Sequence, residues 1–319
     1  MTSGAMTTET ETSEALASKA LTSEARTPRS ARLRFLAPAS ARQYSTALSL
    51  LLVAPLLLLL LLGFVYPVGK LLAGSLFDPE LTLRHYARIL AEPLYLKILW
   101  RTLQIALVVT LGAFLLGYPI AYAMARVSGR WAVVVAACVL IPLWTSILVR
   151  SYAWIVLLQR KGVINNLLTE AGLIESPLRL IYTESAVIVA MTHVLLPFMI
   201  LPIFGSLRTI PDELPKAALN LGAGRTTAFL RVTLPLSLPG VFAGSLMTFI
   251  LALGFYITPA LVGGPSTLMM ATLIGQQTTE LLNWPFAGAL SAVLLVTTLV
   301  LAVTFRRALS FNKGFQDAG

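Results

Sequence analysis

The stretch LSLLLVAPLLLLLLLGFV, residues 48–65, decides the fold because it carries no charged side chain. A helix rises about 1.5 Å per residue, so about 20 apolar residues cross the roughly 30 Å of hydrocarbon in a bilayer. Together with its flanks, this run is too long for a signal peptide, and no clear small-residue cleavage site follows it. We therefore predict an uncleaved membrane-spanning helix over residues 46–69.

The same apolar pattern returns along the rest of the chain. Five more segments are long enough to span a membrane, at 98–124, 131–157, 185–207, 239–262 and 286–305. Of all residues 57% are hydrophobic and 12% are charged, about half the charged fraction of soluble domains. The sequence therefore predicts an all-α membrane protein with six transmembrane helices, its membrane domain covering residues 46–310.

Both ends of the chain differ from this membrane domain. Residues 1–45 are rich in Thr, Ser, Ala and Glu and almost free of large apolar side chains. Such a segment buries too little surface to offset its ordering entropy, so we predict a disordered N-terminal tail. Residues 311–319 are expected to form a short C-terminal tail.

Basic residues predict the orientation. With the N-terminus inside, the inner segments hold 15 Lys and Arg and the outer ones hold nine. Basic residues collect on the cytoplasmic side of membrane proteins. Because the basic residues lie between apolar blocks, they favour anchoring to anionic lipid over binding of nucleic acid. We predict a multi-pass protein of the bacterial inner membrane with both termini in the cytoplasm.

The connection 208–238, which this topology places in the cytoplasm, reads RTIPDELPKAALNLGAGRTTAFLRVTLPLSL. Pro215 suits a first helical turn, and Gly222 can adopt the left-handed conformation that ends a helix. Thr226 or Thr227 can cap a second helix, which Pro235 is expected to stop. The loop is therefore predicted to be a compact helix–turn–helix.

This loop resembles the Glu-Ala-Ala-x3-Gly-x9-Ile-x-Leu-Pro motif of ABC importer permeases. Six residues stand at the motif's spacing: Ala217, Ala218, Gly222, Val232 in place of Ile, Leu234 and Pro235. The resemblance implies the type I ABC importer permease fold and makes the loop a coupling helix that docks on an ATP-binding subunit. It also implies a second permease subunit, identical or different, and a periplasmic solute-binding protein.

The motif's glutamate is missing. Lys216 stands in its place, and Glu213 lies one turn earlier. The charge reversal marks either a partner with altered local charge or a permissive position. On the resemblance alone, Lys216→Glu restores the family residue and is expected to be tolerated. A solvated connector without a partner is the alternative interpretation of the whole loop.

Segments outside the loop resemble the spermidine/putrescine-type branch of this family. They include Phe255-Tyr-Ile-Thr-Pro-Ala-Leu-Val-Gly-Gly-Pro265 and Gly162-Val-Ile-Asn-Asn-Leu-Leu. The resemblance implies import of a polyamine-like small solute. Iron, sulfate, opine and phosphonate permeases share much of the pattern, so these solutes stay open.

The sequence predicts no catalytic, metal or nucleotide site in this chain. The run Gly63-x5-Gly69-Lys70 has the wrong spacing for a phosphate-binding loop and lacks the following Ser or Thr. ATP and Mg²⁺ are therefore expected on a partner subunit. An ion-coupled secondary transporter is the alternative, although no carboxylate lies well inside a span and no inverted repeat is evident.

Polar and aromatic residues within or beside the spans are candidates for the translocation pathway. They are Tyr122, Trp154, His193, Phe255 and Tyr256. Aromatic faces attract cations, but Tyr and Trp also gather at membrane interfaces. For His193, a plain interhelical hydrogen bond is an equal alternative. Gly240 and Gly244 form a small-x3-small pair that predicts close helix packing.

Overall fold

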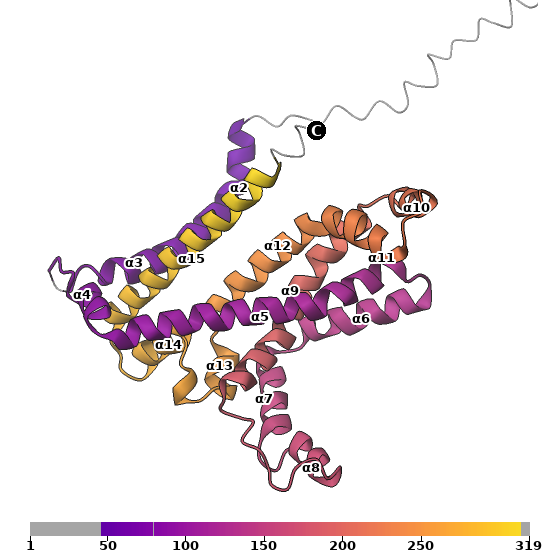
Figure 1. Cartoon of the computed structure of the whole chain (residues 1–319). Coiled ribbons are helices and arrows are strands. Elements are labelled where there is room, and N and C mark those ends of the chain that lie inside the picture. The colour runs from indigo at the N-terminus through magenta and orange to yellow at the C-terminus, as the bar shows by residue number, and fades with distance from the viewer. Residues whose placement is uncertain (1–45, 79, 314–319) are drawn as a thin grey trace, which may run out of the picture. The chain divides into compact units, whose positions relative to one another are not determined.

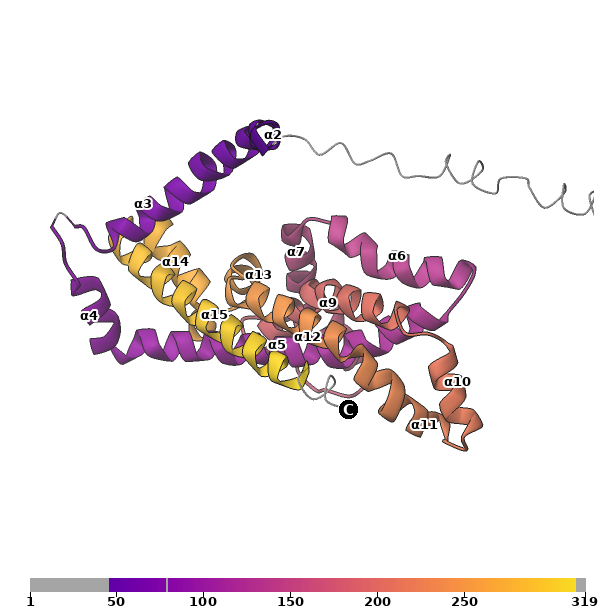
Figure 2. The same ribbon diagram turned by 90° about the horizontal axis from the view of Figure 1, so that it is seen from above.

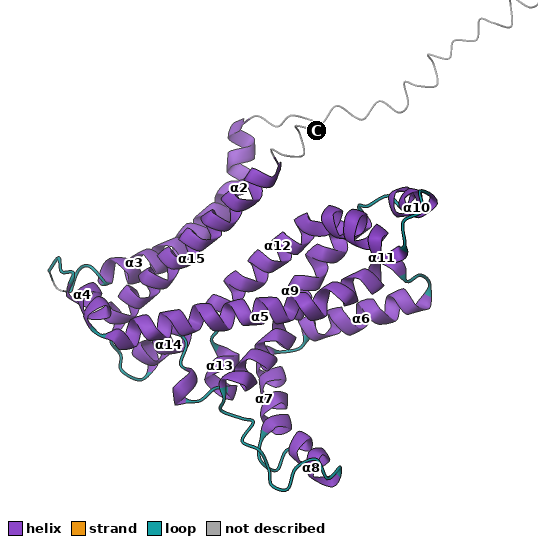
Figure 3. Ribbon diagram, in the orientation of Figure 1, coloured by secondary structure: helices purple, strands orange, loops and turns teal. Residues whose placement is uncertain are grey.

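The computed structural model describes residues 46–78 and 80–313, so the predicted N-terminal tail 1–45 lies outside it. In the described part, helices and loops make up the chain, with one isolated bridge between Phe77 and Leu81 and no strand (Figure 3). The chain divides into two compact units at Val65 and Tyr66. The predicted all-α membrane class is confirmed.

The first unit is helical throughout its described part. It contains α2 (Thr46–Leu60) and the π-helix η2 (Leu61–Val65). The second unit contains α3 (Tyr66–Gly74), α4 (Arg84–Ala91), α5 (Pro93–Arg126), α6 (Arg130–Trp144), α7 (Ile147–Leu158), α8 (Val163–Glu170), α9 (Glu184–Arg208), α10 (Glu213–Asn220), α11 (Arg225–Ala228), η3 (Phe229–Thr233), α12 (Leu234–Leu253), α13 (Ile257–Val262), η4 (Pro265–Thr267), α14 (Met270–Thr279) and α15 (Trp284–Lys313).

Five described helices are long and apolar enough to cross a membrane. They are Leu50–Gly74, Pro93–Arg126, Glu184–Arg208, Arg225–Leu253 and Trp284–Phe305. A sixth span results if the bent pair α6–α7 counts as one crossing. Apart from the two corrections below, the predicted segments fall on these helices.

Helices α5, α9 and α12 pack against one another and contain most of the core (Figures 1 and 2). Gly240 and Gly244 let α12 approach α9 closely. A Cβ on Gly240 would lie 2.6 Å from the Pro202 carbonyl oxygen, and one on Gly244 would lie 2.9 Å from that of Met199. The predicted packing role of this glycine pair is confirmed.

The third predicted span, 131–157, is not one straight helix. It breaks at Thr145 and Ser146, and the two arms meet at 102°. Both the amide and the hydroxyl of Thr145 donate to the Pro142 carbonyl, at 3.3 and 2.8 Å. These bonds end α6, and the extended backbone at Thr145 redirects the chain. The continuous span is therefore corrected to a bent pair.

The fifth predicted span, 239–262, lies too far toward the C-terminus compared with the observed helix. The helix runs over Arg225–Leu253, and α13 is a separate short helix. The α-helical ladder stops at Gly254 because the Phe255 amide turns back to the Ala252 carbonyl at 3.3 Å. Pro259 has no N–H with which to continue the helix. Apolar composition carries on past this break, which is why the prediction ran on to residue 262.

Between α7 and α9 the chain forms a short helix, α8, and a loop. Asn165 is buried and fixes the loop that follows. Its amide nitrogen donates to the carbonyls of Gln159 and Leu178, and its side-chain oxygen accepts from the Leu178 amide at 2.9 Å.

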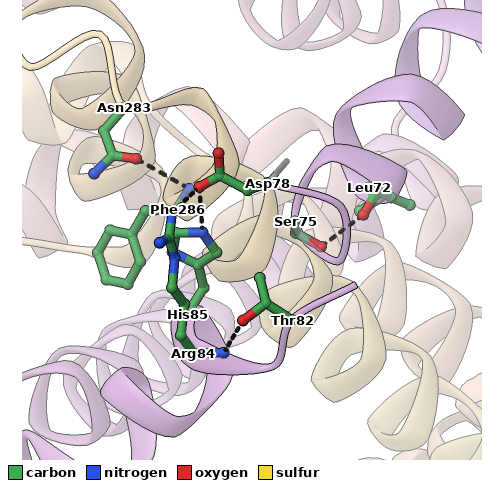
Figure 4. A network of polar contacts seen from close by, with 8 residues as sticks. All are labelled: Leu72, Ser75, Asp78, Thr82, Arg84, His85, Asn283 and Phe286. Atoms are coloured by element: carbon green, nitrogen blue, oxygen red, sulfur yellow. Dashed lines mark hydrogen bonds and ion pairs between the residues drawn. The ribbon is translucent and has the colours of Figure 1, made fainter. Parts of the chain in front are cut away.

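A polar network joins the segment after α3 to α4 (Figure 4). The Asp78 carboxylate pairs with Arg84 and lies 3.0 Å from Nε2 of the buried His85. Arg84 and His85 hold the pKa of Asp78 below its usual range by hydrogen bonding. The centre of the His85 ring lies 6.1 Å from that of Phe286, so the network also lies beside the start of α15.

Candidate docking site on the loop 208–238

Helix α10 begins at Glu213, after a short turn that follows the end of α9 at Arg208. Pro215 occupies its first turn, as predicted. Asp212 precedes the helix but makes no capping bond with its side chain. Its carboxylate instead accepts from Arg126 at 3.2 Å. This pair joins α10 to the end of α5, so the α5–α6 turn and the loop lie at the same end of the bundle (Figure 1).

The end of α10 explains the motif's glycine. Gly222 has a φ of 89°, in the left-handed region that a residue with a Cβ enters at a cost. The Gly222 amide donates to the Leu219 carbonyl, and the Ala223 amide donates to the Ala218 carbonyl, both at 3.0 Å. These two bonds are the Schellman pattern. The predicted helix end at Gly222 is confirmed.

The second helix differs from its prediction at both ends. Gly224, rather than Thr226 or Thr227, occupies its N-cap position. Pro235 does not stop it, because α11, η3 and α12 form one helix from Arg225 to Leu253. The wider π-helical turn of η3 ends at Thr233, two residues before the proline, and such turns relax the constraint that proline imposes on a regular α-helix.

The two halves of the motif lie in different surroundings. Lys216, Ala217 and Gly222 are exposed on the loop, whereas Ala218 is half-buried. In the second half, Leu234 packs on the core cluster that contains Tyr118 and Val241. The second half therefore anchors the loop to the bundle, and the first half faces outward together with Glu213.

Exposed leucines surround the first half of the motif. Leu214, Leu219 and Leu221 are 44%, 42% and 89% exposed. None of the three belongs to a hydrophobic core cluster of the described residues. Exposed apolar groups rimmed by charge are typical of protein interaction sites.

A basic cavity that the sequence did not predict lies between α10 and the helices beside it. It holds about 320 Å³ and is lined by Tyr122, Arg126, Asp212, Pro215, Lys216, Leu219, Arg225, Ala228, Phe229 and Thr233. A second cavity of about 250 Å³ shares Arg126, Asp212 and Thr233 with it and adds Arg208. Nothing in the spacing of these residues reveals the cavity, because the fold brings them together from α5, α10, α11, η3 and the residue before α10.

The structure distributes the predicted pathway residues over three places. Tyr122 lies at the loop end of the bundle, with its ring 5.5 Å from that of Phe229. Trp154 donates to Nδ1 of His193 at 3.3 Å, which joins α7 to α9. Phe255 and Tyr256 lie at the break between α12 and α13. No cluster of three or more His, Cys, Asp or Glu side chains fit to hold a metal occurs in the described residues.

Comparison with known proteins agrees with this fold. Residues 113–309 match the family model described as the binding-protein-dependent transport system inner membrane component. The chain is 36% identical over 233 residues to the spermidine/putrescine transport system permease protein PotB of Escherichia coli, covering 73% of this chain and 84% of the relative. It is also 29% identical over 279 residues to the sulfoquinovosyl glycerol transport system permease protein SmoG of Agrobacterium fabrum, covering 82% and 89%.

Among solved structures, the fold is similar to a chain of a bacterial ABC transporter that imports the acidic polysaccharide alginate. The TM-score is 0.69 at 18% identity, with 82% of this chain and 94% of the other covered. A chain of the MetNI methionine ABC transporter gives a TM-score of 0.53 at 18% identity. At these identities the likeness concerns the fold alone.

Proposed function

This chain belongs to the family of binding-protein-dependent transport system inner membrane components, and on that premise we propose that it couples to an ATP-binding subunit through α10. The exposed half of the motif carries this proposal. Lys216 and Ala217 sit beside Leu214, Leu219 and Leu221 on a short helix whose direction is fixed at both ends. Together they form a docking surface rather than a solvated connector.

The subunit would be a transport component without an enzymatic activity of its own. ATP and Mg²⁺ would bind to the partner subunit, and closure of two such subunits would draw the docked helices together. Because α11, η3 and α12 form one helix, movement of the loop would pass directly into a span. A rigid connection of this kind favours alternating access driven from the cytoplasm.

The transporter would contain further proteins. A second permease subunit, identical to this one or different, would complete the pathway, and a periplasmic solute-binding protein would deliver the cargo. The exposed apolar faces of the long helices support contacts with lipid and with such a subunit. We propose that the loop 208–238 and both termini face the cytoplasm, as the distribution of basic residues favours.

The cargo we propose is a polyamine-like small solute. PotB, a permease protein of a spermidine/putrescine transport system, supports this choice. SmoG, a permease protein of a sulfoquinovosyl glycerol transport system, shows that related chains serve other solutes. Trp154, His193, Phe255 and Tyr256 are proposed to line the pathway, with Tyr122 at its inner end. Aromatic rings attract cations, by about 0.5–2 kcal/mol each.

Uptake into proteoliposomes tests this function. The chain is reconstituted with the permease, ATP-binding and solute-binding proteins that co-purify with it from its host, and labelled spermidine is supplied outside. Uptake that requires ATP inside the vesicles and stops without the binding protein is expected. Uptake driven by a proton or sodium gradient alone would instead identify an ion-coupled secondary transporter.

A further inference from the structure

Resting on the proposed docking of α10, we propose that the basic cavity beside this helix receives an acidic side chain of the ATP-binding subunit. The cavity brings together three cationic side chains from three elements: Arg126 of α5, Lys216 of α10 and Arg225 of α11. Arg208 lines the adjoining cavity. In the family motif the permease supplies the acidic residue at this position. Here Lys216 stands there, and the partner would supply the Asp or Glu.

The charges around the cavity do not balance. Asp212 is the single carboxylate in either lining, and it pairs with Arg126 at 3.2 Å. Within the described residues, no ion pair is formed by Lys216, Arg208 or Arg225. Four cations against one anion leave the lining with a charge of +3. A concave surface with such an excess attracts an anionic group.

The walls of the cavity are held in place. The Arg126 guanidinium lies 5.5 Å from the centre of the Tyr122 ring, and the Tyr122 ring meets Phe229 edge-on at 5.5 Å. The Arg126–Asp212 pair fixes the start of α10. The volume of about 320 Å³ is larger than a carboxylate, so it admits an Asp or Glu side chain together with bridging water.

The position favours a protein carboxylate over a lipid phosphate. The Lys216 side chain is exposed on the docking helix itself, beside Leu214 and Leu219, so a partner that covers those leucines also covers the cavity. A rim charge that meets its opposite on the partner selects that partner and speeds association. The lysine at the motif's glutamate position thereby marks a partner with altered local charge.

Carbodiimide cross-linking tests the contact directly, because the reagent joins a lysine amine to a carboxylate only when the two touch. Membranes containing the whole transporter are treated, and the cross-linked peptides are identified by mass spectrometry. We expect Lys216 joined to one Asp or Glu of the ATP-binding subunit. A link from Lys216 only to Asp212 or Glu213 of its own chain, or no link at all, would overturn the proposal.

Charge variants give a second, independent readout. Lys216→Glu, which restores the family residue, is expected to lower the affinity for the ATP-binding subunit by about tenfold or more instead of being tolerated. Arg225→Glu should act alike. Arg231→Glu is the matched control, since Arg231 is an exposed cation of the same loop outside both cavities. A lysine introduced at the cross-linked acid should restore binding to Lys216→Glu.

The outcomes separate this proposal from the function on which it rests. If the wild-type chain does not retain the ATP-binding subunit, the docking function itself fails. If retention is normal and Lys216→Glu binds as tightly as Arg231→Glu, the docking function stands and the acidic contact is refuted. A third result would assign the cavity to lipid and refute a protein carboxylate. In that case Lys216→Glu would retain the ATP-binding subunit normally, but transport would depend on anionic phospholipid in the vesicles.

Discussion

The Ala223 amide donates to the Ala218 carbonyl at 3.0 Å across the end of α10. This bond forms only because the chain between them reverses at Gly222 with a φ of 89°. Two residues of the motif therefore act together: Gly222 permits the turn, and the Ala218 carbonyl accepts the hydrogen bond that closes it. Lys216 lies exposed on the same short helix, whose end this turn defines.

Close packing of α12 on α9 predicts the effect of adding one methyl group. Gly240→Ala would place a Cβ 2.6 Å from the Pro202 carbonyl oxygen and 2.5 Å from Cβ of Ser206. Overpacking of this kind costs about 1–3 kcal/mol. We expect a lower midpoint of thermal unfolding in detergent and a reduced yield of folded protein.

Gly205→Ala is the control for that experiment. Gly205 lies inside α9, and a Cβ there would have no neighbour within 4 Å. Alanine favours a helix over glycine by about 0.5–1 kcal/mol, so this variant should be as stable as the parent or more so. Equal destabilisation by both alanines would mean that α9 and α12 are not packed through Gly240.

Acid should weaken the network at the start of α4. Arg84 and His85 hold the pKa of Asp78 below its model-peptide value of 3.8. A carboxylate with a lowered folded pKa contributes stability above its unfolded pKa, and this contribution is lost as the pH falls through the folded pKa. Asp78→Asn should therefore lower the unfolding midpoint at pH 7. The difference from the parent should shrink as the pH falls below about 4 and disappear once the pH lies below the folded pKa of Asp78, as thermal scans from about pH 2 to pH 7 would show.

The proposed topology is tested by cysteine labelling. In a Cys138→Ser background, a cysteine at Thr226 should resist a membrane-impermeant maleimide in intact spheroplasts and react after permeabilisation. A cysteine at Ser176 should react in both. Both parent side chains are exposed, so burial does not limit the reaction. Reaction of the Thr226 variant in intact spheroplasts would contradict the proposed orientation.

The Trp154–His193 bond separates a pathway role from a structural one. Trp154→Phe keeps an aromatic ring beside His193 but removes the donor at 3.3 Å. Interhelical hydrogen bonds contribute about 0.6 kcal/mol, so the unfolding midpoint should change little. If the pair lines the pathway, the KM for uptake should rise several-fold. An unchanged KM with a lowered unfolding midpoint would mean that the Trp154–His193 hydrogen bond has a structural role only.

Hydropathy predicted the number and rough position of the spans because lipid imposes one length on every crossing helix. The break at Thr145 was not predictable, since Val139 and Ile147 are apolar on both sides of it and the bend depends on where the hydroxyl of Thr145 bonds. Pro235 was misjudged for a similar reason. A proline stops a regular α-helix, and only the structure reveals the π-helical turn before it.

The motif located the docking helix, and turn chemistry located its end at Gly222. The basic cavity escaped prediction because its cationic members are separated by up to 99 residues, from Arg126 to Arg225, and meet only in the fold. The signal that could have pointed to it was the lysine at the motif's acidic position. Exposure of Leu221 likewise required the structure, since an apolar residue near a helix end is more often buried.

Retention of the ATP-binding subunit by Gly222→Asp is the most direct test of the central claim. Asp tolerates a φ of 89° less well than Gly, and its charge would enter a docked surface where an unpaired charge costs several kcal/mol. A Cβ at Gly222 meets no atom of this chain within 4 Å, so the fold should survive. The coupling assignment predicts normal membrane insertion and assembly with the second permease, with loss of the ATP-binding subunit on co-purification. Full retention of that subunit together with normal uptake would contradict it.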